Sequence, residues 1–259
     1  AKHTVSTNLT VNAGAALKGN NVTISSDSRI GSVANSDGGG GSLITLTGSV
    51  GTATGSNSST INIGQDANIE ALQDLTVLAD QDSYVTADGE STGGGLGFNG
   101  EASASANLSF GVKQTIDGNL TAGGDLNVSN KVSNNADSRA EAYGGGLGAS
   151  TTVRATSAIK RVGGFKGAEI ILQNDADLTG GEVTIHSDIV RNRGNAWTNT
   201  TAGGAGGSAR AFSTSTINSD NEVILQDGDN NTGYEYILIQ AEYSDTDNFA
   251  RSQERLYAI

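Results

Sequence analysis

The chain contains no cysteine, no proline and no methionine, and aromatic residues make up only 5% of its 259 residues. Without cysteine, neither a disulfide nor a thiolate-bound metal can form, and cysteine-dependent nucleophilic catalysis is excluded. Proline cannot donate a ladder hydrogen bond inside a sheet, so its absence is compatible with extensive β-structure. No apolar run approaches the roughly 18 residues of a membrane-spanning helix, so we expect no membrane insertion.

Basic residues are also scarce, with 15 Lys and Arg against 28 Asp and Glu and a formal net charge of -13. A general nucleic-acid-binding protein needs a basic surface, so nucleic acid is not an expected partner. Hydrophobic residues amount to 35% of the chain, which is low for a globule with one thick core. The composition therefore favours a core that is long and narrow.

Glycine, by contrast, is abundant, with 37 residues, and four stretches of the chain are clusters of glycine. The last three clusters begin at Gly93, Gly144 and Gly203, which lie 51 and 59 residues apart. The clusters read "SDGGGGSLITL", "STGGGLGFNGEAS", "AYGGGLGASTTV" and "TAGGAGGSARAF". Recurrence at a near-constant interval is the signature of a repeat architecture.

A second marker, an apolar-x-apolar kernel, recurs between the clusters with spacings of 53, 51, 57 and 54 residues between first members. Each kernel alternates like a short half-buried strand. Parallel stacking about 4.8 Å apart would bury the two apolar positions as two continuous ladders, as in a solenoid. The kernels are Val22 and Ile24, Leu75 and Val77, Leu126 and Val128, Val183 and Ile185, and Ile237 and Ile239.

Segments that flank the glycine clusters alternate small apolar and polar residues, as in Ala102–Phe110. We interpret each pair of flanking segments as a β-hairpin arm folded at the cluster, where glycine permits positive φ and close stacking of backbones. Two smaller coils per repeat are the alternative.

The sequence therefore predicts an all-β fold, a parallel β-helix (solenoid) with about five coils of ~54 residues, each carrying a Gly-tipped arm. Residues 1–259 are expected to form a single array. Its repeats are placed at 5–58, 59–111, 112–162, 163–218 and an incomplete 219–259.

A charged position follows each kernel start by five residues and would form a column in the stacked coils. Asp27 and Asp80 would be neighbours, with repulsion of about 1 kcal/mol in water, and Lys131 would sit mid-column. A solvated charge ladder is one interpretation, and Ca²⁺ bound by carboxylate oxygens is the other. The candidate metal ligands are Asp27, Asp80, Asp188 and Glu242.

No catalytic or cofactor-binding residues are predicted. His186 is one of two histidines and is interpreted as a lone surface imidazole. Acidic and basic residues that could serve a polysaccharide lyase or hydrolase are spread without a concentrated constellation. They are Asp80, Asp82, Asp88, Asp137, Glu141, Arg139, Arg154 and Arg161.

The repeat style of Gly118–Ser129, mirrored at Asp177–Ser187, resembles the repeats of giant filamentous-haemagglutinin-like bacterial surface proteins. This resemblance implies a right-handed parallel β-helix. It also implies export to the surface of a Gram-negative-type bacterium and a role in adhesion, biofilm or a fibrous surface layer.

We therefore expect a non-enzymatic structural or adhesive segment of an extracellular, cell-surface protein. Its expected partners are copies of itself or neighbouring repeats of the same long chain, with surface glycans as a further candidate. A glycan- or Ca²⁺-binding module and a β-helical polysaccharide-degrading enzyme are the alternatives.

Overall fold

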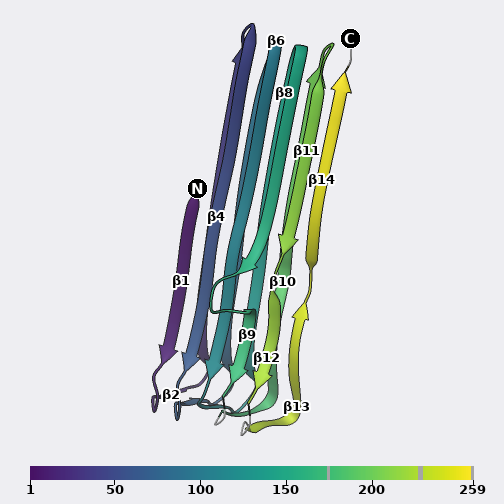
Figure 1. The fold of residues 1–259 in the computed structure, drawn as a ribbon. Coiled ribbons are helices and arrows are strands. Elements are labelled where there is room, and N and C mark those ends of the chain that lie inside the picture. Colours follow the sequence, from purple (N-terminus) through teal and green to yellow (C-terminus); the bar gives the residue numbers. More distant parts are fainter. Residues whose placement is uncertain (174–175, 227–229, 258–259) are drawn as a thin grey trace.

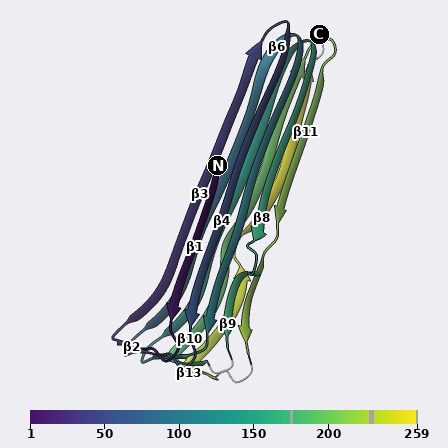
Figure 2. The same cartoon turned by 60° about the vertical axis from the view of Figure 1, so that its left-hand side comes forward.

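A computed structural model describes residues 1–173, 176–226 and 230–257 as a parallel β-solenoid without a helix in those residues. Its strands form one 14-stranded sheet that folds into an elongated, flattened stack (Figures 1 and 2). The strands are β1 (Lys2–Val11), β2 (Ala16–Gly19), β3 (Val22–Gly41), β4 (Ile44–Ile63), β5 (Asn68–Ala71), β6 (Leu75–Ile116), β7 (Asn119–Ala122), β8 (Leu126–Arg161), β9 (Gly167–Leu172), β10 (Asp177–Gly203), β11 (Ser208–Ile217), β12 (Asp220–Leu225), β13 (Asn230–Tyr243) and β14 (Thr246–Tyr257).

The kernel ladder predicted from the sequence is confirmed. Val22 pairs with Leu75, Leu75 with Leu126, Leu126 with Val183, and Val183 with Ile237, all in parallel register. The second kernel residues, which lie two positions further along each strand, pair in the same order. We call each row of laterally paired residues, one from each coil, a rung column.

Each repeat is one long, flat coil and not two smaller ones. In the first coil β3 runs as an ascending arm to Gly41 and β4 returns as a descending arm from Ile44; β6 contains both arms of the second coil. Short strands β2, β5 and β7 stack at the base. The arms do fold at the glycine clusters, but every pairing among the described residues is parallel and joins neighbouring coils. The two arms of one coil therefore meet through side chains and not as a hydrogen-bonded hairpin.

An insertion of five residues accounts for most of the longer third spacing of the kernels. Phe110 pairs with Arg161, but Val112 pairs with Ala168, so residues 162–166 form extra chain between β8 and β9. The loop is visible as the excursion between these strands in Figure 1. Residues after the loop return to the ladder, because β9 again pairs with β6.

The core between the two arms narrows toward the tips. Near the base it contains large side chains such as Leu75, Leu108 and Phe110, which are fully buried. Further along the arms, most inward positions are held by Ala, Ser and Gly, and Gly93, Gly100 and Gly144 leave room for the buried ring of Phe98 near the second tip. At Gly89 an added Cβ would lie 2.5 Å from the carbonyl oxygen of Ser103 on the opposite arm. Small residues therefore set the thickness of the outer half.

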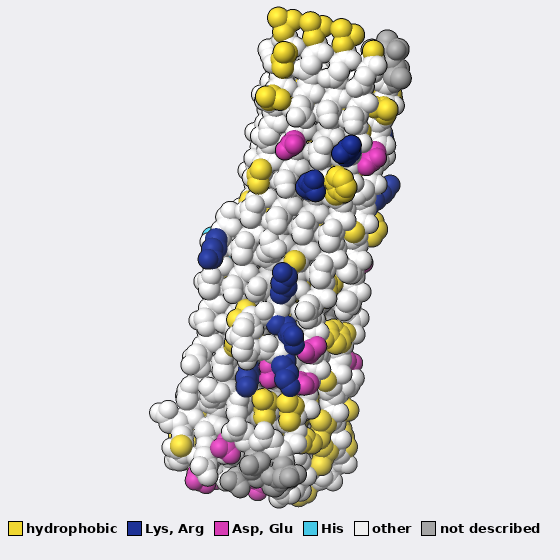
Figure 3. Space-filling view, viewed as in Figure 1, with side chains coloured by type: hydrophobic (Ala, Val, Ile, Leu, Met, Phe, Trp, Pro, Cys, Tyr) yellow, Lys and Arg dark blue, Asp and Glu magenta, His cyan; other side chains and the backbone are white. Residues whose placement is uncertain are grey.

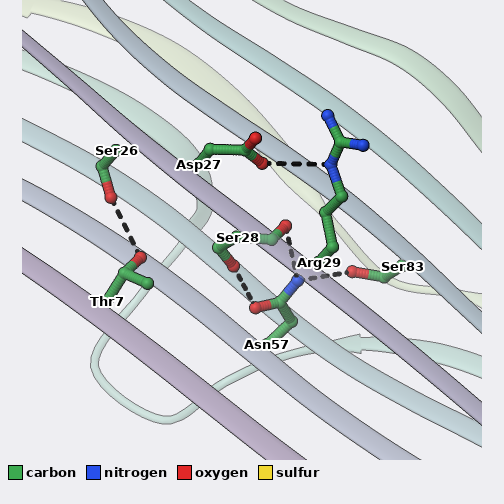
Figure 4. A network of polar contacts seen from close by, with 7 residues as sticks. All are labelled: Thr7, Ser26, Asp27, Ser28, Arg29, Asn57 and Ser83. Carbon is green, nitrogen blue, oxygen red and sulfur yellow. Dashed lines mark hydrogen bonds and ion pairs between the residues drawn. The ribbon is translucent and has the colours of Figure 1, made fainter.

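Polar side chains bridge the arms at mid-height (Figure 4). Asn57 of β4 is fully buried; its amide nitrogen donates to Ser83 Oγ at 2.9 Å and to the Ser28 carbonyl at 3.2 Å, and its oxygen accepts from Ser28 Oγ. Because buried polar groups are costly unless paired, this network fixes how the ascending arms face the descending ones.

The tips carry an exposed row of leucines. Leu43, Leu96 and Leu147 occupy the turns of three successive coils and are 71%, 55% and 63% exposed. Figure 3 shows hydrophobic side chains along the upper end of the molecule, where the tips lie. At the third tip Gly146 has φ of 152°, and an added Cβ would lie 1.8 Å from the Gly95 carbonyl oxygen, so glycine is required there by conformation and by close stacking.

Candidate functional site

The predicted charged column exists. Asp27 pairs with Asp80, Asp80 with Lys131, Lys131 with Asp188, and Asp188 with Glu242. The carboxylate of Asp27 is joined to Arg29 at 3.2 Å. Because Lys131 lies between the two pairs of acidic residues, the four predicted ligands do not form one continuous carboxylate ladder.

The imidazole of His186 lies beside Asp188 and Glu242, the last two residues of the column. His186 Nε2 lies 3.0 Å from Glu242 Oε1, and His186, Asp188 and Glu242 offer ligand atoms within 4.8 Å of one another. Ser244 Oγ donates to Asp188 Oδ1 at 2.9 Å. The prediction that His186 is a lone surface imidazole is therefore wrong, because its ring contacts a carboxylate of the neighbouring coil. An imidazole with two carboxylates is a donor set for transition-metal ions more than for Ca²⁺, which takes oxygen ligands.

Replacing Lys131 by glutamate is expected to lower the free energy of unfolding by about 1–2 kcal/mol at low ionic strength. The new carboxylate would face Asp80 and Asp188 across adjacent rungs, and each like-charge pair costs about 1 kcal/mol in water. Urea unfolding at 10 mM and 500 mM NaCl measures the effect, which salt should reduce.

The control for this prediction is Lys160→Glu, which reverses a charge on an exposed position whose ladder neighbour is Ser109. An equal loss of stability in both variants would show that the column is not electrostatically coupled.

A second site is a groove on the outward face of the ascending arms, called the Trp197 groove. Its main pocket has a volume of about 460 Å³ and is lined by Asp88, Asp137, Ser138, Arg139, Asn195 and Trp197. An adjoining pocket of about 290 Å³ shares Asp88 and Arg139 and adds Asn35, Asp37, Gly89, Glu90 and Glu141.

Strand register builds this groove. Asn35, Asp88, Arg139 and Trp197 belong to four successive coils and form one rung column. Strict alternation along each ascending arm turns this column outward, while the neighbouring Ala87, Ala140 and Ala196 point into the core. Three rung spacings of about 4.8 Å make the column roughly 14 Å long.

Arg139 is held in a defined position by two contacts. Its guanidinium carbon lies 4.7 Å from the centroid of the Trp197 ring, within cation–π range. Its Nη2 lies 2.8 Å from Glu141 Oε2. Glu141 also accepts from the Tyr143 hydroxyl at 2.7 Å, and Asn199 Nδ2 donates to that hydroxyl at 2.9 Å.

Negative charge dominates the groove. Burial raises the pKa of the Asp88 carboxyl above its usual range; Arg139 opposes this shift, and the carboxylates of Asp137, Glu141 and Asp37 reinforce it. Burial and the neighbouring Glu141 also raise the pKa of Tyr143. The groove therefore combines several hydrogen-bond acceptors, one guanidinium and one large aromatic ring.

No motif of the sequence marks these residues as a group. The prediction that the acidic and basic residues are spread without a constellation is wrong for four of them, because the structure brings Asp88, Asp137, Arg139 and Glu141 together. Asp82 and Asp80 lie six and eight residues before Asp88 on the same arm, and Arg154 and Arg161 lie on the descending arm. Trp197 is a further residue of the groove that the sequence analysis does not predict; its one available signal is that the only tryptophan of the chain occupies an outward position of an alternating strand.

No family model matches this chain, and neither a curated protein nor a solved structure matches it. Among residues 1–173, 176–226 and 230–257, no helix is long and apolar enough to cross a bilayer.

Proposed function

We propose that this chain is a non-enzymatic structural and adhesive segment of a secreted bacterial cell-surface protein. In this proposal its coils extend a fibre by β-stacking against copies of the chain or against neighbouring repeats of the same long chain. The observation that carries the proposal is the open strand ladder of the last coil, described next. The resemblance of the repeats to filamentous-haemagglutinin-like surface proteins supports the surface location.

The fifth coil exposes side chains that the inner coils bury. Val183 and Ile185 are fully buried, whereas Ile237 and Ile239, their partners on β13, are 43% and 41% exposed. Among the described residues β13 and β14 pair only with β10, so their outer edges carry unpaired backbone groups. An exposed apolar strand edge is a template for another strand.

One further coil would cover the exposed apolar side chains and pair the free backbone groups at the same time. Its kernel would pair with Ile237 and Ile239 and continue the two apolar ladders. Its backbone would take up the free N–H and C=O groups of β13. In a solenoid each coil contacts chiefly its neighbours, so the same surface serves coils of one chain or of two.

Engineered cysteines test this proposal, because the chain contains no cysteine of its own. Ser25, Leu78, Ser129, His186 and Gln240 form one rung column. If a second copy continues the ladder in register, its Ser25 follows Gln240 at about 4.8 Å, within the Cα range of a disulfide. A mixture of Ser25→Cys and Gln240→Cys chains should form covalent heterodimers on mild oxidation.

The control mixture contains Ser25→Cys and Thr156→Cys, since Thr156 is exposed on a descending arm in the middle of the array. Heterodimers at the same low level in both mixtures would reject in-register stacking. Analytical ultracentrifugation of the unmodified chain over a range of concentrations gives an independent measure, and assembly should increase with concentration.

A further inference from the structure

We propose that the Trp197 groove binds a linear glycan built from uncharged sugar units. The groove lies within one chain and involves neither open end of the ladder. It therefore does not depend on the stacking proposed above, and either proposal can fail while the other stands.

The shape of the groove fits an extended ligand. Its main pocket of about 460 Å³ lies within the range of small-molecule sites. The adjoining pocket of about 290 Å³ continues from it through shared Asp88 and Arg139. Since the column from Asn35 to Trp197 crosses four coils, or roughly 14 Å at 4.8 Å per rung, the groove can contact several sugar units in a row.

The chemistry of the groove matches sugar hydroxyls. Asp88 and Asp137 accept hydrogen bonds, the Arg139 guanidinium donates them, and the Asn195 amide can do both. One oxygen of Asp137 accepts from Asn135 at 3.0 Å, while its other oxygen is buried without a partner in the described residues. A hydroxyl group that donates to this oxygen would satisfy it.

Trp197 supplies the apolar surface that such a ligand also needs. Sugar rings present C–H groups on their faces, and these are attracted to the negative face of an aromatic ring. The indole is half-buried on the outward face of β10, and Arg139 lies over one face of its ring, so a sugar would pack against the part of the ring that Arg139 leaves exposed. Arg139 is in turn held by the nearly buried Glu141, so the wall of the groove is organised before a ligand arrives.

The charged side chains that line the groove disfavour both anionic and cationic ligands, and therefore favour an uncharged one. An anionic glycan would meet the carboxylates of Asp37, Asp88, Glu90 and Asp137, which repel it. A cationic ligand would compete with Arg139, because this guanidinium already occupies the cation site over the Trp197 ring at 4.7 Å. Neutral sugars meet neither obstacle.

The experiment uses Trp197 as its own reporter, because it is the only tryptophan in the chain. Intrinsic fluorescence is titrated with cellohexaose, maltohexaose and N-acetylated chitohexaose, at 50 and 500 mM NaCl. We expect a saturable change with at least one of these hexasaccharides and the same dissociation constant at both salt concentrations. Hexagalacturonate, which is anionic, should produce no saturable change.

Variants are compared by isothermal titration calorimetry with the hexasaccharide that binds. Asp137→Asn keeps the size of the side chain, and we expect it and Trp197→Ala each to weaken binding about tenfold or more. The matched control is Phe212→Ala. It removes the ring of the other cation–π pair, formed by Arg154 and Phe212 at 4.8 Å on the descending arms, and should leave binding unchanged.

Three results would overturn the proposal. The first is no saturable signal with any of the uncharged hexasaccharides. The second is binding that persists in Trp197→Ala and in Asp137→Asn while both variants keep the parent's circular dichroism spectrum. The third is salt-sensitive binding of spermine without saccharide binding, which would identify the groove as a site for cationic ligands.

Discussion

Replacing Leu126 by alanine should lower the free energy of unfolding by about 2–5 kcal/mol, the range for truncating a fully buried leucine. Leu126 has no exposed surface and lies between Leu75 and Val183 in the kernel ladder. Neighbouring coils hold both partners by backbone hydrogen bonds, so the structure has little freedom to close the cavity. Urea unfolding monitored by circular dichroism and by Trp197 fluorescence measures the loss.

Trp197 fluorescence reports on the fourth coil, whereas circular dichroism reports on the strands of the whole chain. Leu126 belongs to the third coil and Trp197 to the fourth, and these coils are paired along β8 and β10. Because stability in a solenoid is shared between neighbouring coils, the fluorescence transition should shift together with the circular dichroism transition. The control is Leu96→Ala at an exposed tip. A loss below about 1 kcal/mol for Leu126→Ala would contradict the tightly packed ladder inferred here.

Replacing Gly89 by valine should cost about 3 kcal/mol, at the upper end of the range for overpacking. An added Cβ at this position would lie 2.5 Å from the carbonyl oxygen and 3.1 Å from the carbonyl carbon of Ser103. These are backbone atoms of the opposite arm, so no side chain can turn aside to make room. The two arms must separate, and the stacked coils above and below resist this movement.

Gly145→Val is the matched control for Gly89→Val. Gly145 lies near the third tip, and a Cβ there would meet nothing within 4 Å. Valine also favours extended backbone, so the control should keep or slightly raise the melting temperature. Equal melting temperatures for the two variants would show that the arms are not held at the observed separation.

The surroundings of His186 could be predicted from the sequence only in part. His186 shares its ladder position with uncharged residues, such as Ser129 and Gln240. Its carboxylate partner, Glu242, lies two positions further along the next coil. Side chains on one face of a sheet reach such diagonal neighbours, so a comparison along single columns could not find this pair.

The Trp197 groove could not be predicted from the sequence for a different reason. Asp88 and Arg139 are 51 residues apart, the same interval as Leu75 and Leu126, so their proximity follows from the repeat period. Arg139 and Trp197 are 58 residues apart, because the register shifts several times between β8 and β10, most strongly at the loop 162–166 and again at a bulge between Ile189 and Arg191. No single period could therefore place the aromatic ring beside the acidic residues.

The sequence by itself determined the all-β class, the stacking period and which side chains form the apolar ladders. It could do so because alternation fixes the buried face of a strand, and a repeated pattern buries that face only when equivalent positions coincide. Only the tertiary structure decided that the two arms of a coil hydrogen-bond to neighbouring coils and not to each other. Alternation marks the two faces of a strand and carries no information about its edges, so the partner of each backbone group is chosen by the packing of the whole stack.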